Sequence, residues 1–296
     1  MCVAQKNRTF TPEFGKRTME RYLTHYTFLF LGALFSLLIF GCNSSTTWNE
    51  LEFYNVEKLE QLSEKPLEPE EGEEDEFAAL REKENREMDV KVDMQFVKSD
   101  NQANERVCKL INDQLIEILL KQSSELSIDE AVAQYIEDVK KEFHSDEIAN
   151  VYYDHLTGRA EYGMEKVINY RLKEEVFVGG AHPSTTTTIL RFDAQTGEFI
   201  SLDNVFTTLN QNKLQELLLD KLMKDTHTHS LAELHEKGWL EMTDMFVSNN
   251  FALREDSIEF FYNEYDIAPY ANGVTSICLG YDDVKDLIST TWENRK

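Results

Sequence analysis

Histidine side chains are the groups in this sequence whose type and spacing could do chemistry near neutral pH. His182 stands in the run Gly-Gly-Ala-His-Pro over 179–183, and His227, His229 and His235 fall within nine residues. Imidazole can act as a general base or as a metal ligand, but both roles need partners beside it. Glycine before His182 and proline after it also suit a tight turn that ends a strand, and we favour this structural interpretation over catalysis.

The three later histidines form the cluster that a zinc site would need, with Glu233 and Glu236 nearby. They fall at the end of a predicted helix and in the loop after it, whereas His-x-His ligands commonly lie on a strand. No His-Glu-x-x-His motif is present. A polar turn that ends the helix explains the same residues, so we expect no metal and no cofactor.

Pro269 and Tyr270 offer a different kind of site, because rigid aromatic rings are efficient anchors for binding. A packed loop with a buried tyrosine is the alternative. Cys108 and Cys278 have no Cys-x-x-Cys partner, and buried free thiols are the default expectation, with a disulfide as the alternative. No Gly-x-Ser-x-Gly elbow occurs. We therefore predict no catalytic residues, and His182, Pro269 and Tyr270 as ligand-binding candidates.

Helical and strand periodicities indicate the elements that must position these residues. Apolar side chains recur at helical spacing over 104–121, 127–143 and 211–225, and Ser127 with Glu130 forms a capping box. Alternating patterns predict strands over 168–172, 184–192, 258–262 and 276–281, with a glycine turn at 193–197. Helices followed by hairpin-connected strands indicate an α+β fold, with helices packed on one face of a largely antiparallel sheet.

Two motifs carry a family resemblance. Gly179-Gly180-Ala181-His182-Pro183 before a threonine-rich strand, and the run Tyr-Asp-Ile-Ala-Pro-Tyr-Ala-Asn-Gly over 265–273, resemble paired signatures of the RsiV-like extracytoplasmic domain family, which includes the non-catalytic region of PdaC-type peptidoglycan deacetylases. The resemblance spans roughly Val90 to Ile288. It implies an envelope domain of unknown function, with a fold likened to part of the heat-shock cognate ATPases and with lysozyme as one known type of partner.

The sequence departs from that family in two respects. It carries neither a deacetylase catalytic domain nor a cytoplasmic segment of the size needed to hold a sigma factor. The ATPase likeness implies no nucleotide binding, because no Gly-x-x-x-x-Gly-Lys-Ser/Thr loop is present.

The N-terminal region reads as an export signal. The apolar run Phe28–Gly41 is too short for a bilayer-spanning helix, and the sequence around Cys42 resembles the lipobox of bacterial lipoproteins. We predict a lipoprotein signal over 1–41 with Met1 or Met19 as its start, lipidation of Cys42 and an outer-membrane anchor facing the periplasm. An uncleaved anchor is the alternative. Residues 42–89 are predicted to be an acidic disordered tether, and 90–296 the folded domain.

Charge narrows the classes of function. The 296 residues carry 55 acidic against 30 basic side chains, a net charge of -25, which disfavours nucleic-acid binding. Such a surface attracts cationic partners. We therefore expect a non-enzymatic cell-envelope lipoprotein that binds peptidoglycan, another glycan or a lysozyme-like cationic protein. The alternatives are an envelope hydrolase that uses His182 or the His227, His229 and His235 cluster, and a structural assembly lipoprotein.

Overall fold

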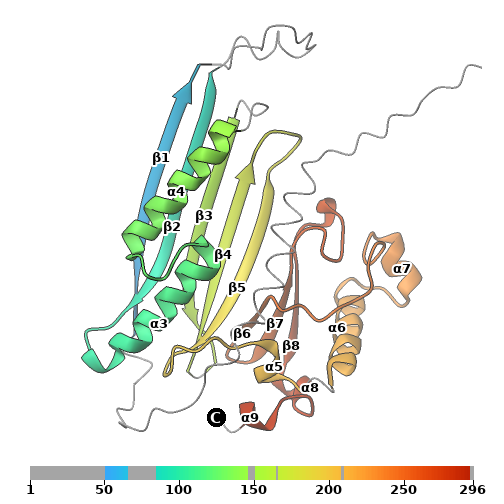
Figure 1. The fold of residues 1–296 in the computed structure, drawn as a ribbon. Coiled ribbons are helices and arrows are strands. Elements are labelled where there is room, and N and C mark those ends of the chain that lie inside the picture. Colours follow the sequence, from blue (N-terminus) through green and yellow to red (C-terminus); the bar gives the residue numbers. More distant parts are fainter. Residues whose placement is uncertain (1–50, 66–84, 146–150, 165, 208–209, 294–296) are drawn as a thin grey trace, which may run out of the picture. The chain divides into compact units, whose positions relative to one another are not determined.

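A five-stranded sheet forms the larger part of the protein in the computed structural model (Figure 1). The structure describes residues 51–65, 85–145, 151–164, 166–207 and 210–293, all of which belong to one unit of the chain, Ser45–Lys296. The strands lie in chain order, and every neighbouring pair is antiparallel except the parallel pair β2 and β3. The strands are β1 (Glu52–Glu64), β2 (Arg86–Lys98), β3 (Val151–Tyr162), β4 (Val167–Phe177) and β5 (Ser184–Asp193).

Two helices cover one face of this sheet (Figure 1). They are α3 (Glu105–Leu115), which continues into a π-helical turn at Ile116–Leu120, and α4 (Ile128–Ser145). Parallel strands need a long crossover connection, and these helices supply it between β2 and β3. Alternate residues of β2, from Met88 to Phe96, are buried beneath them, as a strand with one covered face requires.

A second sheet of three antiparallel strands carries the C-terminal half. It contains β6 (Phe251–Leu253), β7 (Ser257–Tyr262) and β8 (Thr275–Gly280), in that order. Helix α6 (Gln211–Asp225) buries Leu214, Leu218 and Leu222 in the core of this sheet. The remaining short helices are α5 (Leu202–Val205), α7 (Leu231–Glu236), α8 (Tyr281–Val284) and α9 (Thr290–Glu293), with 3-10 turns at Gln102–Asn104 and Tyr270–Asn272.

Side chains, rather than a continuous ladder, join β5 to the second sheet. Asn250 accepts from the Ile189 amide at 2.6 Å and donates to the Thr187 carbonyl at 2.7 Å, so its amide group replaces a neighbouring strand. Asn169 makes the same paired contact with the main chain of Leu253, at 2.9 and 3.0 Å. Buried backbone groups need partners, and these amides supply them where the two sheets meet.

Arg191 of β5 lies fully buried at the same joint. Its Nε and Nη1 donate to the carbonyl oxygens of Ile200, Ile189, Asn249 and Phe251 at 2.9 to 3.0 Å. The guanidinium also lies 3.7 Å from the Phe251 ring centroid. Burial lowers the pKa of Arg191 to about 9, whereas the carbonyl oxygens and rings favour its charged form.

The fold class agrees with the α+β prediction, and the helices at 104–121, 127–143 and 211–225 are confirmed. The capping box is present, since the Glu130 amide donates to Ser127 Oγ at 3.3 Å and the Ser127 amide donates to Glu130 Oε2 at 2.9 Å. The expected single sheet is divided into two. Strand β3 and the N-terminal strands β1 and β2 were not predicted as strands.

The proposed start of the folded domain at Val90 is wrong, because β1 and the beginning of β2 lie within the predicted tether. An edge strand needs few apolar residues, and Tyr54, Val56 and Leu62 suffice to pack β1 against the core. Its carboxylates stay near solvent, where Glu60 pairs with Lys140 at 2.8 Å. The most acidic part of the tether, the signal segment and Cys42 lie outside the described residues.

None of the helices in the described ranges combines the length and the apolar character that a bilayer crossing requires.

Candidate functional site: an exposed aromatic surface

The loop after β7 holds two tyrosines in fixed positions. The Asn263 amide donates to Asp266 Oδ2 at 2.7 Å, and the Tyr265 amide donates to the Ala268 carbonyl at 3.0 Å. These turns place Tyr265 at a φ of 69°, a left-handed conformation that is costly for a bulky side chain. Burial raises the pKa of the Asp266 carboxyl, while the hydrogen bond from Asn263 opposes that rise. The loop is therefore pre-organised before any ligand arrives.

His182 reaches the same place from the loop between β4 and β5. Gly179 and Gly180 have φ values of 90° and 106°, and Gly180 has no atom within 4 Å of the position of a Cβ. These glycines permit the turn that carries the exposed histidine. His182 Nδ1 lies 2.8 Å from the Pro183 carbonyl oxygen, which can only accept, so Nδ1 bears the proton and Nε2 faces away from this contact.

The two motifs meet ring to ring. The His182 and Tyr270 rings stack with centroids 4.0 Å apart and an interplanar angle of 18°. Tyr265 stacks beside Tyr270 at 6.2 Å and 30°. Tyr265 is 64 % exposed and Tyr270 38 % exposed, so both rings present area to solvent. We call His182, Tyr265 and Tyr270 the aromatic surface.

A second row of rings lies on β3 and β4. Tyr153 stacks on His155 at 5.0 Å and on Phe177 at 5.6 Å. Burial raises the pKa of the Tyr153 hydroxyl, Glu175 adds to that rise, and Tyr270 makes a smaller contribution. Tyr270 thus lies within electrostatic range of this row.

The structure therefore brings His182, Pro269 and Tyr270, the ligand-binding candidates, to one exposed region. The alternative of a buried tyrosine does not describe Tyr270, which keeps more than a third of its surface. Tyr265 belongs to the same surface but was missed as a site residue, although it lies within the second motif. The stack of Tyr270 on His182 depends on the joint between the sheets, which sequence spacing does not encode.

The three later histidines occupy different structural positions. His227 lies just after the Thr226 cap of α6 with a φ of 52°, the His229 amide donates to Glu233 Oε2 at 2.8 Å, and His235 lies in α7. Among the described residues, no three His, Cys, Asp or Glu side chains gather closely enough to hold a metal ion.

Both thiols of the described chain are free, as predicted, but burial was predicted correctly for Cys108 alone. Cys278 is exposed because it lies on the outward-facing positions of β8. Burial raises the pKa of the Cys108 thiol. Neighbouring side chains partly desolvate the Cys278 sulfur, although the residue as a whole is exposed, and this desolvation and the charge of Glu259 raise its pKa.

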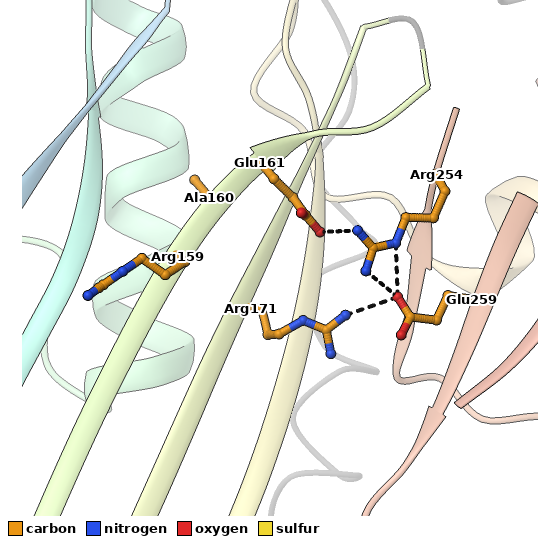
Figure 2. A pocket seen from close by; sticks show the side chains of 6 residues that line it. All are labelled: Arg159, Ala160, Glu161, Arg171, Arg254 and Glu259. Carbon is orange, nitrogen blue, oxygen red and sulfur yellow. Dashed lines mark hydrogen bonds and ion pairs between the residues drawn. The ribbon is translucent and has the colours of Figure 1, made fainter. Parts of the chain in front are cut away.

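Sequence reasoning also missed a hollow of about 410 Å³ where β3 and β4 face the second sheet (Figure 2). Arg254 bridges Glu161 at 2.7 Å and Glu259 at 2.9 Å, and Arg171 donates to the same Glu259 oxygen at 3.0 Å. Burial acts to raise the pKa of Glu259, but hydrogen bonds from Ser276 and Arg254 and the charge of Arg171 hold it below its usual value. Side chains alternate between the two faces of a strand, so a strand predicted at β3 would have placed Arg159 and Glu161 on one face.

Comparison with known proteins now adds to this geometry. Residues 203–282 match the family described as protein of unknown function (DUF3298). The DUF3298 match includes α6, the second sheet and the loop that carries Tyr265 and Tyr270, whereas the five-stranded sheet precedes it.

One similar protein is the peptidoglycan-N-acetylmuramic acid deacetylase PdaC of Bacillus subtilis (strain 168), 25 % identical over 171 residues. The match takes in 54 % of this chain but only 36 % of PdaC, about a third of that protein's length.

Two solved structures share the fold. A DUF3298 family member from Bacteroides fragilis NCTC 9343 aligns with a TM-score of 0.64 and 22 % identity over 81 % of this chain and 94 % of that one. A DUF3298 family protein from Pseudomonas aeruginosa PAO1 aligns with a TM-score of 0.51 and 12 % identity, over 81 % and 96 % of the two chains. At these identities the likeness concerns the fold.

Proposed function

We propose that this protein is a non-enzymatic binding protein of the bacterial cell envelope whose ligand is a glycan, with peptidoglycan as the leading candidate. The observation that carries the proposal is the stack of His182 on Tyr270, with Tyr265 beside it, on a loop fixed by its own hydrogen bonds. The similarity to part of a peptidoglycan deacetylase, which covers 36 % of that protein, supports a role in the cell envelope.

The physical reason lies in the rings. The face of an aromatic ring carries negative charge density, and the C–H groups on one face of a sugar carry a small positive charge. Exposed, rigid rings therefore bind sugar faces with little loss of side-chain entropy. His182 Nε2 adds a polar group at the edge of the surface, since Nδ1 is engaged with Pro183. A backbone conformation as costly as that of Tyr265 is typical of functional sites.

We propose further that the domain is held in the envelope by lipid on Cys42, which makes the membrane a partner through its N-terminus. The apolar run before Cys42 and the lipobox-like residues support this anchor, and the absence of an acidic residue directly after Cys42 supports the outer membrane.

A cationic protein of the lysozyme type is the second candidate ligand, favoured by the net charge of -25. Attraction by charge alone weakens as salt rises, because the Debye length falls to about 8 Å at physiological ionic strength. Lysozyme binding that survives physiological salt would therefore indicate specific recognition, whereas binding that is lost would indicate attraction by charge alone.

The test is co-sedimentation of the full chain, in mild detergent, with insoluble peptidoglycan, and calorimetry with lysozyme at low and physiological salt. We expect Tyr270→Ala to weaken glycan binding about tenfold or more, the effect of removing a central aromatic anchor. Tyr270→Phe should stay within about threefold of wild type, because the ring face remains.

Phe246→Ala is the matched control, since Phe246 is 36 % exposed and lies outside the aromatic surface. Equal retention of the Tyr270→Ala and Phe246→Ala variants would contradict the proposed site. Failure of wild type to sediment with peptidoglycan, together with lysozyme binding that survives physiological salt, would replace the glycan by a protein ligand.

A further inference from the structure

Arg159 and Arg171 occupy directly opposed positions on the antiparallel strands β3 and β4. Side chains opposite one another in such a pair lie on the same face with Cβ atoms about 5 Å apart, and like charges there destabilise the sheet. Both are on the face that α3 and α4 leave open, since the alternate residues Leu156 and Leu172 are buried on the helix side. The pairing of Arg159 with Arg171 is therefore unfavourable for the stability of the sheet taken alone.

The two guanidinium groups point away from each other and leave the hollow between them (Figure 2). Arg159 turns to β2, where its Nη2 lies 2.6 Å from Asp93 Oδ2. Arg171 turns to the second sheet, where it pairs with Glu259 and lies 5.2 Å from the Phe261 ring centroid. Arg159, Ala160, Arg171 and Arg254 line the hollow together with the carboxylates Glu161 and Glu259. The Arg159 guanidinium itself is turned out of it, since Nη1 also donates to the Asp93 and Gly158 carbonyl oxygens at 2.9 Å.

Donors remain available in this lining. An arginine carries five N–H donors, and Arg171 spends its Nη2 on Glu259, with no further hydrogen bond to another described residue. The Arg171 side chain is 29 % exposed and that of Arg254 36 %, so their groups are open to solvent. Glu259 holds both in place, because its Oε2 accepts from each of them and its Oε1 accepts from Ser276 at 2.7 Å.

We propose that this hollow is a binding site for an oxyanion, a carboxylate or phosphate group of a ligand, held by the unused donors of Arg171 with Arg254 beside it. The planar guanidinium matches two oxygens of such a group, which gives geometry as well as charge. A volume of about 410 Å³ accommodates the group together with part of the molecule that carries it.

The site goes beyond the glycan function and does not depend on it. Tyr153 is the residue of β3 that lies within electrostatic range of Tyr270. Arg159 lies six residues further along the same strand, which is about 20 Å at the rise of a strand. The Tyr270→Ala variant should therefore bind anions as wild type does.

The experiment titrates the full chain with inorganic phosphate and, separately, with succinate, at constant ionic strength set with sodium chloride. Calorimetry and the rise of the unfolding temperature report binding, because a ligand of the folded state stabilises it. We expect saturable binding of at least one of the two anions, which Arg171→Gln weakens about tenfold. A preference for phosphate indicates a phosphate-bearing ligand, and a preference for succinate indicates a carboxylate-bearing one.

Lys173→Gln is the matched control, because Lys173 lies two residues from Arg171 on the same face of β4 and loses the same charge outside the hollow. It should change the affinity less than twofold. Arg171→Lys, which keeps the charge but loses the planar fork, should weaken binding severalfold. Arg159→Gln removes a guanidinium that is already paired with Asp93, so it should weaken binding less than Arg171→Gln does.

The proposal is overturned if neither anion binds saturably, or if Lys173→Gln weakens binding as much as Arg171→Gln does. The second result would mean that general charge attracts the anions. Circular dichroism of each variant confirms that its fold is retained.

Discussion

Arg191→Met tests whether the buried arginine joins the two sheets that bring the aromatic surface together. His182 precedes β5 and Tyr270 follows β7, so the stack depends on how the two sheets meet. Methionine fills a similar volume and removes the donors, so the cost reports lost hydrogen bonds more than a cavity.

The magnitude follows from the contacts. Three N–H groups, one on Nε and two on Nη1, serve four carbonyl oxygens at 2.9 to 3.0 Å. At about 1 kcal/mol for each N–H group lost, the free energy of unfolding should fall by about 3 kcal/mol. For a domain of this size, that corresponds to a fall of about 6–12 °C in the unfolding temperature.

Urea unfolding, followed by the fluorescence of buried Trp292, measures this change. Arg106→Met is the control, because Arg106 is exposed on α3 and its loss should cost less than about 0.5 kcal/mol. If Arg191→Met costs less than about 1 kcal/mol, the hydrogen bonds of Arg191 do not hold the joint together.

Three further predictions concern other contacts. The pKa of Glu259 is held below its ordinary value, so its carboxylate stabilises the fold above that ordinary value, and this stability is lost as the pH falls through the lowered pKa. Denaturation between pH 6 and pH 3 should show a fall that is smaller in Glu259→Gln; identical pH profiles would exclude this role. Ser127→Ala should cost about 1 kcal/mol through loss of the α4 cap, measured by urea unfolding, and no change would contradict it. Gly158→Ala should cost about 1–3 kcal/mol, because its Cβ would lie 2.1 Å from the Tyr170 hydroxyl oxygen. A double-mutant cycle with Tyr170→Phe should recover part of that loss, and strict additivity would refute the clash.

Local patterns determined much of the secondary structure. The helix predicted at about 211–225 is confirmed as α6, because its leucines recur at helical spacing and its buried residues all lie on one face. The strand around Ile168 to Leu172 and the α4 cap were equally readable. The same patterns failed at β1, where Tyr54, Val56 and Leu62 are scattered among carboxylates that remain near solvent at the sheet edge.

By itself, the sequence determined the α+β class, the acidic charge and the choice of His182, Pro269 and Tyr270 as residues of interest. Tertiary structure alone decided that His182 stacks on Tyr270, since these rings are separated along the chain by most of the second sheet. It also decided that Arg159 and Arg171 face each other, because the register of β3 on β4 follows from pairing over whole strands. Periodicity encodes which face a residue takes, whereas long-range packing selects its neighbours.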